Sequence, residues 1–282
     1  MGQVTVGLLH PGRMGSAIAA QLRVAGHRVL WCPVGRSAGS VRRAEQAGLE
    51  PAADLAELLA ASEAVFSICP PAAAQELAEE VATAGFGGIF VEANAISPQR
   101  MSAIARRFGS TDARVVDGAI IGPPPSTADQ ARVYLSGPGA AVAIVLGLLD
   151  LGSARPVSLG ERIGQASALK MAYGSFQKTS RALAAVSHAI ADDYGVTEEL
   201  LVEADLLGPN ALIDRDHLPS AAARAWRWAP EMLEAAESAR ALGLPDALAT
   251  GSAEVMARWA ADRDDFDLDP ATALRHLHRD PE

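Results

Sequence analysis

Near its start the chain reads Val6-Gly7-Leu8-Leu9-His10-Pro11-Gly12-Arg13-Met14-Gly15, which joins a short apolar run to an alanine-rich segment of helical periodicity. His10, Gly12 and Gly15 stand at the spacing of a G-x-G-x-x-G turn whose first glycine is replaced. Gly12 would let the backbone approach a pyrophosphate, and Gly15 would let helix and strand pack closely. The stretch predicts a dinucleotide-binding βα unit with a nicotinamide cofactor; the alternative is a glycine turn needed only for packing.

Short apolar runs alternate with helical stretches from residue 3 to about residue 159, which is typical of βαβ units. The predicted strands are 4–9, 28–32, 64–69, 88–92, 114–121, 133–136 and 155–157. The predicted helices are 12–24, 40–47, 54–61, 72–84, 98–108 and 139–152. We therefore expect the α/β class, with residues 1–160 forming an NAD(P)-binding Rossmann domain built on a doubly wound parallel sheet.

The remainder of the chain shows helical periodicity without strand runs, over residues 161–194, 198–208, 222–242 and 244–261. The tail from residue 262 is expected to be a short exposed helix or partly disordered. Residues 161–282 are thus predicted to form an all-α domain.

The chain has 282 residues and a formal net charge of −10, so it lacks the basic field that nucleic acid or an anionic membrane would attract. We expect a small-molecule substrate and neither of those partners. Cys32 and Cys69 lie in apolar runs and form no disulfide framework or metal motif. With no signal peptide and no long uncharged apolar stretch, the protein is expected to be soluble and cytoplasmic.

The segment after the second predicted strand reads Trp31-Cys32-Pro33-Val34-Gly35-Arg36-Ser37, without the carboxylate that usually binds the ribose hydroxyls of NAD. Arg36 stands there instead, with Ser37, Ser40, Arg42 and Arg43 nearby. These groups could bind a 2′-phosphate through charge-assisted hydrogen bonds, which favours NADP(H) as the cofactor. The alternative for Arg42 and Arg43 is a solvated helix face.

The opening turn, the strand ends that follow and one lysine-bearing helix resemble the β-hydroxyacid dehydrogenase family, which includes 3-hydroxyisobutyrate and 6-phosphogluconate dehydrogenases. Imine reductases share this fold. The sequences His-Pro-Gly-Arg-Met-Gly, Gly122-Pro123-Pro124-Pro125 and Pro230-Glu231-Met232 resemble a branch whose C-terminal domain has no known function. The resemblance covers nearly the whole chain.

The resemblance implies which strand ends border the cofactor. Asn94 replaces the family's usual serine and could reach the nicotinamide ribose or carboxamide; alternatively it caps the helix that begins at Pro98. Together with the turn and the arginine segment, the predicted cofactor-binding residues are His10, Pro11, Gly12, Arg13, Met14, Arg36, Ser37, Cys69, Pro70, Pro71 and Asn94.

The family's catalytic lysine corresponds to Lys170 in Gly164-Gln165-Ala166-Ser167-Ala168-Leu169-Lys170. Apolar surroundings disfavour a charged amine and would ready Lys170 for proton transfer. Taken alone, such a lysine would be a snorkelling surface residue. Tyr173 stands one turn later, where the family has asparagine, as a second proton donor or a core aromatic.

Two further departures concern the substrate. Ile121, Gly122 and Pro123 replace a Ser-Gly-Gly turn that holds a carboxylate in many relatives, so a less polar or bulkier substrate is expected. Glu231, where dehydrogenases often carry the Asp of a Lys-Asp pair, could bind a cationic amine or position water beside Trp226. Alternatively, Glu231 faces solvent next to tryptophans at a dimer interface.

These residues together predict an NADP-dependent oxidoreductase that transfers hydride between NADPH and a carbonyl or alcohol, with Lys170, Tyr173 and Glu231 as catalytic candidates. Ile121, Gly122, Pro123 and Trp226 are the substrate-binding candidates, and no metal is indicated. The alternatives are an imine reductase or reductive aminase, and a non-catalytic NADPH-binding protein. The resemblance also implies that residues 161–282 serve substrate binding and dimerisation, with a homodimer that packs through the alanine-rich helix around residues 181–191.

Overall fold

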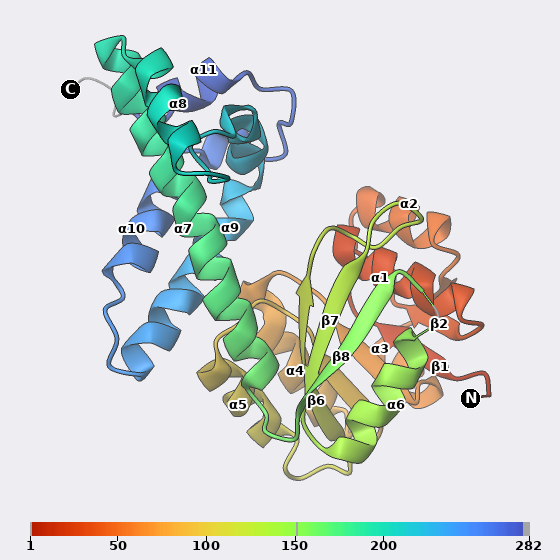
Figure 1. The fold of residues 1–282 in the computed structure, drawn as a ribbon. Coiled ribbons are helices and arrows are strands. Elements are labelled where there is room, and N and C mark those ends of the chain that lie inside the picture. The colour runs from red at the N-terminus through yellow and green to blue at the C-terminus, as the bar shows by residue number, and fades with distance from the viewer. Residues whose placement is uncertain (1, 151, 279–282) are drawn as a thin grey trace. The chain divides into compact units, whose positions relative to one another are not determined.

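The computed structural model describes residues 2–150 and 152–278, which divide into two compact units, Met1–Lys170 and Met171–Glu282. Figure 1 shows a sheet flanked by helices in the first unit and helices alone in the second. The predicted roles of residues 1–160 in cofactor binding, and of residues 161–282 in substrate binding and dimerisation, stay predictions.

One sheet of eight strands forms the centre of the first unit, in the order β3-β2-β1-β4-β5-β6-β7-β8. All neighbouring pairs are parallel except β6 and β7, which are antiparallel. The strands are β1 (Thr5–Leu8), β2 (Arg28–Trp31), β3 (Glu50–Pro51), β4 (Ala64–Ser67), β5 (Ile89–Glu92), β6 (Arg114–Ile121), β7 (Ala131–Ser136) and β8 (Ala154–Gly160). The prediction of an α/β class with a doubly wound sheet is confirmed.

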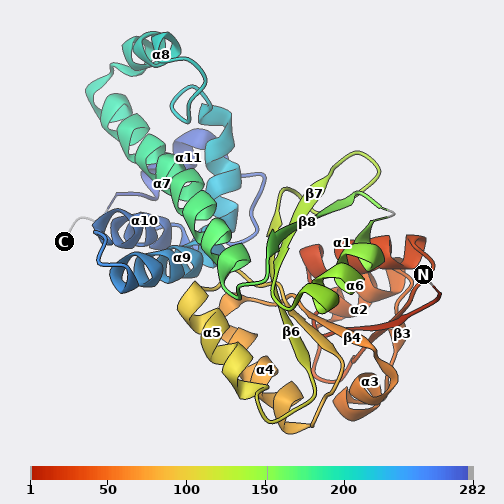
Figure 2. The same cartoon turned by 60° about the horizontal axis from the view of Figure 1, so that its bottom comes forward.

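Helices cover both faces of this sheet (Figure 2). One face is covered by α1 (Arg13–Val24), α2 (Ala38–Gln46) and α6 (Gly139–Leu149), and the other by α3 (Leu55–Ala61), α4 (Ala74–Thr83) and α5 (Pro98–Arg107). Successive strand residues alternate between the two cores: Ile89 and Val91 point to the first, and Phe90 points to the second. Burial on both faces explains why these strands read as continuous apolar runs.

Two details of the sheet differ from expectation. The sequence predicted seven strands, and the eighth, β3, is a two-residue strand too short to give a periodic signal. The sheet was expected to be wholly parallel, but β7 runs antiparallel to β6. The nine residues between Ile121 and Ala131 are too few for a crossover helix, which a parallel connection needs.

In the second unit every regular element of the described residues is a helix, as predicted. The α-helices are α7 (Gln165–Tyr194), which begins in the first unit, α8 (Thr197–Leu206), α9 (Leu218–Ala241), α10 (Ala247–Ala257) and α11 (Pro270–Arg275). Trp259 Nε1 donates to the Ala273 carbonyl at 2.7 Å and so ties α11 to the preceding segment. Within residues 2–150 and 152–278, no helix is both long and apolar enough to cross a membrane.

Candidate functional site

Strands β1, β2, β4, β5 and β6 all end at one edge of the sheet, called here the carboxyl edge. Strand order reverses between β1 and β4, and ligands of doubly wound sheets bind at such a switch point. The predicted cofactor-binding residues lie on the loops that follow β1, β2, β4 and β5, or at the start of α1 or of the 3₁₀ turn Pro71–Ala73. The fold thus brings segments far apart in sequence to one edge.

The turn after β1 leaves open space at the N-terminus of α1. Gly12 is the N-cap residue of α1, so no side chain caps the helix there, whereas Ser37 caps α2. A Cβ on Gly12 would meet nothing within 4 Å, while a Cβ on Gly15 would lie 2.2 Å from the His10 carbonyl oxygen. Gly15 therefore permits the close packing of α1, and the space at Gly12 stays open for an anion near the helix N-terminus.

Arg36 reaches back from the loop after β2 to the turn after β1. Its Nη1 lies 2.8 Å from His10 Nε2, and its Nη2 donates to the Leu9 carbonyl at 3.1 Å. Burial, and next the charge of Arg36, lower the pKa of His10 to about 4. The β2 loop and the glycine turn are thereby held together at the carboxyl edge.

The two arginines of α2 behave differently. Arg42 is exposed, as a solvated helix face would be. Arg43 is half-buried, and its Nε donates to the Pro11 carbonyl at 2.9 Å, so the solvated-face interpretation is wrong for Arg43. Arg43 is a second link between α2 and the glycine turn.

Asn94 joins the ends of β4 and β5. Its Oδ1 accepts from the Cys69 N–H at 2.5 Å, and its Nδ2 donates to Ser67 Oγ at 3.0 Å. The helix-capping alternative for Asn94 is wrong, because Ser97 caps α5 by accepting from the Arg100 N–H. Burial, and next the nearby Glu92 carboxyl, raise the pKa of the Cys69 thiol to about 12. Cys69 is therefore a neutral part of this loop.

Two carboxyl groups that the sequence reasoning did not assign to the site are buried side by side. Glu92 and Asp117 are register partners on β5 and β6 and are 1% and 0% exposed. Burial raises the pKa of Glu92 to about 8 and also raises that of Asp117, although Asp117 accepts several hydrogen bonds. The signal for both was an acidic residue inside an apolar strand.

Asp117 binds the start of the helix that carries Lys170. Its carboxylate accepts from the N–H groups of Gly164, Ala166 and Ser167 at 2.9–3.1 Å and from the hydroxyls of Ser167 and Ser136. Lys170 is half-buried, and its Nζ donates to the Ile120 carbonyl at 2.6 Å. Strand β6 thus holds both the first turn of α7 and the lysine amine, at the carboxyl edge.

The predicted substrate-binding residues of the first unit lie at the end of β6. Ile121 is buried opposite Arg132 of β7, whereas Gly122 and Pro123 are exposed. Gly122 has a φ of +122°, a conformation that favours glycine. A chain reversal with an exposed proline thus follows directly on the strand that holds Lys170.

The other candidates belong to the second unit, where Tyr173 is 43% exposed on α7. Glu231 of α9 forms an ion pair with Lys178 of α7, with Nζ and Oε2 2.8 Å apart and side chains 15% and 7% exposed. The solvent-facing alternative for Glu231 is therefore wrong. Trp226 packs its ring under the Arg263 guanidinium, 3.9 Å from the ring centroid.

Lys178 was missed by the sequence reasoning. Its Nζ lies 5.9 Å from the ring centroid of Trp228, which is 9% exposed. Gly174, one turn earlier, leaves the room that this lysine needs, since a Cβ there would lie 3.2 Å from Nζ. In the sequence, the only indication that Lys178 packs along the helix was Gly174, four residues earlier on the same predicted helix.

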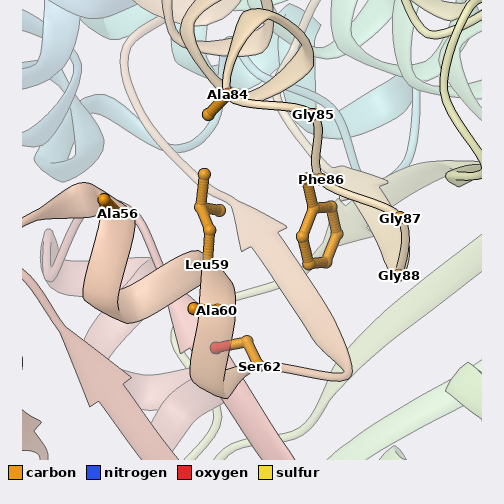
Figure 3. A pocket seen from close by; sticks show the side chains of 9 residues that line it. All are labelled: Ala56, Leu59, Ala60, Ser62, Ala84, Gly85, Phe86, Gly87 and Gly88. Atoms are coloured by element: carbon orange, nitrogen blue, oxygen red, sulfur yellow. The ribbon is translucent and has the colours of Figure 1, made fainter.

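A hollow of about 380 Å³ lies at the opposite edge of the sheet, where β4 and β5 begin. Figure 3 shows Leu59 of α3 and Phe86 of the loop before β5 along it. None of the predicted site residues lines this hollow. Among the described residues, no cluster of three or more His, Cys, Asp or Glu side chains is arranged to hold a metal ion.

Comparison with solved structures shows the same fold in several proteins. A conserved hypothetical protein from Sinorhizobium meliloti is 24% identical, with 98% of this chain and 96% of that chain covered and a TM-score of 0.71. Mycobacterium tuberculosis 3-hydroxyisobutyrate dehydrogenase is 18% identical (98% and 100% covered, TM-score 0.77). A reductive aminase from Aspergillus terreus is 19% identical (98% and 100% covered, TM-score 0.56). The comparison with curated proteins gives no match.

Family models account for most of the chain. Residues 191–259 match a domain of unknown function, DUF1932. Residues 5–160, more than half of the chain, match the NAD binding domain of 6-phosphogluconate dehydrogenase. The resemblance inferred from the sequence is confirmed, and the chain belongs to the family with the NAD binding domain of 6-phosphogluconate dehydrogenase.

Proposed function

We propose that the protein is an NADP-dependent oxidoreductase in which Lys170 acts as the acid/base for a carbonyl or alcohol substrate. One observation carries the proposal: Lys170 Nζ is held by the Ile120 carbonyl at the carboxyl edge, within the same compact unit as the glycine turn. In this proposal residues 1–160 hold the cofactor, and residues 161–282 contribute to substrate binding and dimerisation.

The choice of NADP rests on the loop after β2. It offers Arg36 and Ser37 where an NAD-specific domain usually offers a carboxylate. The reductive aminase of the same fold was solved with NADPH. His10, Pro11, Gly12, Arg13 and Met14 would surround the pyrophosphate, and Cys69, Pro70, Pro71 and Asn94 would border the nicotinamide half.

The proposed chemistry assigns one proton transfer to Lys170. A bound nicotinamide supplies or accepts the hydride, and Lys170 gives a proton to the forming alkoxide oxygen or takes one from the alcohol. The Ile120 carbonyl accepts a hydrogen bond from one of the three N–H groups of the ammonium and so orients the amine. Tyr173, one turn later on α7, is proposed as a second proton donor.

The substrate is proposed to be less polar than a small hydroxy acid. Ile121 and Pro123 provide no hydroxyl or N–H donor for a carboxylate at the end of β6. Trp226 and Glu231 are proposed to contribute from the helical domain, with Glu231 acting together with its partner Lys178.

The test combines binding and turnover. NADPH binding is measured by nucleotide fluorescence, and turnover is measured on aldehydes, ketones, hydroxy acids and cyclic imines. A Lys170→Ala variant should bind NADPH like the wild type and lose at least about 100-fold in kcat. Unchanged turnover would remove the lysine from the mechanism. Turnover of imines alone would make the protein an imine reductase, and binding without any turnover would favour a non-catalytic NADPH-binding protein.

The homodimer is proposed to form through the exposed face of α7. Phe176, Leu183 and Ile190 recur every seven residues on α7 and are 77%, 65% and 57% exposed. The alanines of this helix, such as Ala182 and Ala185, are buried inside their own unit and cannot make that contact. A second copy of the chain would cover this apolar row by two-fold pairing. Light scattering should give a dimer mass for the wild type and a monomer mass for Leu183→Glu; a monomeric wild type would contradict the proposal.

A further inference from the structure

Two residues that depart from the usual dinucleotide-binding pattern are in contact in this structure. His10 replaces the first glycine of the turn, and Arg36 stands where a carboxylate usually follows the second strand. They are 26 residues apart in sequence, and their nitrogen atoms, His10 Nε2 and Arg36 Nη1, lie 2.8 Å apart. The two replacements therefore form one unit at the carboxyl edge.

The contact fixes the tautomer of His10. A guanidinium donates hydrogen bonds and accepts none, so His10 Nε2 must be the acceptor and the imidazole proton resides on Nδ1. The pKa of His10, lowered to about 4 by burial and by the charge of Arg36, keeps this neutral form at physiological pH. Arg36 is held at a second point by the Leu9 carbonyl.

Each partner also has a buried nitrogen without a hydrogen-bond partner among the described residues: Arg36 Nε and His10 Nδ1. In the tautomer above, both atoms carry a proton and are donors. Because these two donors are buried, a ligand would be bound by the N–H groups of Arg36 Nη1 and Nη2 that His10 and Leu9 do not use. Phosphate oxygens are strong acceptors for guanidinium groups.

We propose that His10 is a specificity-determining residue that positions Arg36 for the 2′-phosphate of NADPH. Without the imidazole, Arg36 would keep the Leu9 carbonyl as its anchor and would swing away from the phosphate more freely. The inference rests on the proposed NADP dependence and assigns it to a pair of residues. His10, at the first glycine position, then acts through the phosphate-binding arginine.

The test measures dissociation constants for NADPH and NADH by nucleotide fluorescence on the wild type, His10→Gly, Arg36→Ala and the double variant. His10→Gly restores the usual glycine and should weaken NADPH binding roughly tenfold, the loss of about one hydrogen bond to a charged group. NADH binding should weaken clearly less than NADPH binding, because only NADPH carries the 2′-phosphate that Arg36 would bind, and a cooperative thermal melt shows that the variant is folded. The double variant should be no weaker than Arg36→Ala alone, because His10 acts through Arg36.

Two further variants sharpen the test. His10→Gln keeps an acceptor near the position of Nε2 and should retain most of the NADPH preference. Arg42→Ala removes an exposed arginine of the neighbouring helix α2 and should leave the ratio of the two dissociation constants unchanged within about twofold.

Two results would overturn the inference alone: equal weakening of NADPH and NADH by His10→Gly, or independent, multiplying effects of the two substitutions. A wild type that binds NADH more tightly than NADPH would overturn the proposed NADP specificity as well. The failures of the two proposals are thus distinguishable.

Discussion

Lys178 Nζ lies 2.8 Å from a carboxylate oxygen of Glu231, and this ion pair joins α7 to α9 inside the second unit. Both side chains are largely buried, at 7% and 15% exposure. Removing one member leaves the other as a charge with little hydration, which costs more than the pair itself contributes.

Glu231→Ala should therefore lower the free energy of unfolding by about 3 kcal/mol. Replacing both members, as Lys178→Met with Glu231→Leu, should recover most of this loss. The matched control is Arg240→Ala, whose pair with Asp246 is far more exposed, at 61% and 31%, and should contribute less than about 1 kcal/mol. Urea unfolding followed by circular dichroism measures all three. If Glu231→Ala were as stable as the parent, water would already reach Lys178.

The stability of the protein should decrease as pH rises, because of Glu92. Its pKa of about 8 in the folded state, caused by burial, lies above the ordinary value of 4.5. Between these two values the folded state holds a proton that the unfolded chain has released, so rising pH favours unfolding. This group should lower the free energy of unfolding by up to about 1.4 kcal/mol per pH unit across that window.

The check is a comparison with Glu92→Gln, a neutral side chain of nearly the same shape. Unfolding free energies at pH 5, 6, 7 and 8 should fall less steeply for this variant than for the wild type. Glu45→Gln, at an exposed position of α2, serves as the control and should leave the slope unchanged. Parallel curves for wild type and Glu92→Gln would mean that Glu92 is ionised in the folded protein.

The sheet was predictable where strands are buried on both faces. Strand β6 was predicted over residues 114–121 and spans those residues, because apolar residues continue on both sides of Asp117 and Gly118. Strand β3 was missed, since two residues carry no periodicity. The direction of β7 depends on the length of its connection to β6 rather than on the residues of either strand.

Contacts between distant residues limited what the sequence could say about the site. The turn glycines and Arg36 were identified from local pattern and strand order. That Arg36 binds His10 depends on β1 and β2 being neighbours and on one side-chain conformation. The pairing of Lys178 with Glu231 spans 53 residues and two helices, so no local pattern indicated that Lys178 is the partner of Glu231.

The helix that carries Lys170 should loosen at its start when Asp117 is removed. Asp117 accepts from three backbone N–H groups and the Ser167 hydroxyl there, all buried. In Asp117→Ala, hydrogen exchange of residues 164–170 should quicken roughly tenfold or more. Asp117→Asn keeps an acceptor oxygen and should show a smaller effect. Residues 197–206 of α8 serve as the internal control, and unaltered exchange at 164–170 would contradict the anchoring role.

Substitution of the two turn glycines, Gly12 and Gly15, should affect stability and cofactor binding separately. Gly15→Ala puts a Cβ 2.2 Å from the His10 carbonyl oxygen, a backbone atom that cannot move cheaply, so stability should fall by about 1–3 kcal/mol. Gly12→Ala adds a Cβ into open space at a φ of −70°, and alanine is a poorer N-cap than glycine, so stability should fall by no more than about 1 kcal/mol. That same methyl occupies the space a pyrophosphate would need, and NADPH binding should weaken at least about tenfold. Thermal melting and nucleotide fluorescence on both variants make the distinction. If Gly12→Ala bound NADPH as tightly as the wild type, the cofactor would not pass over this turn.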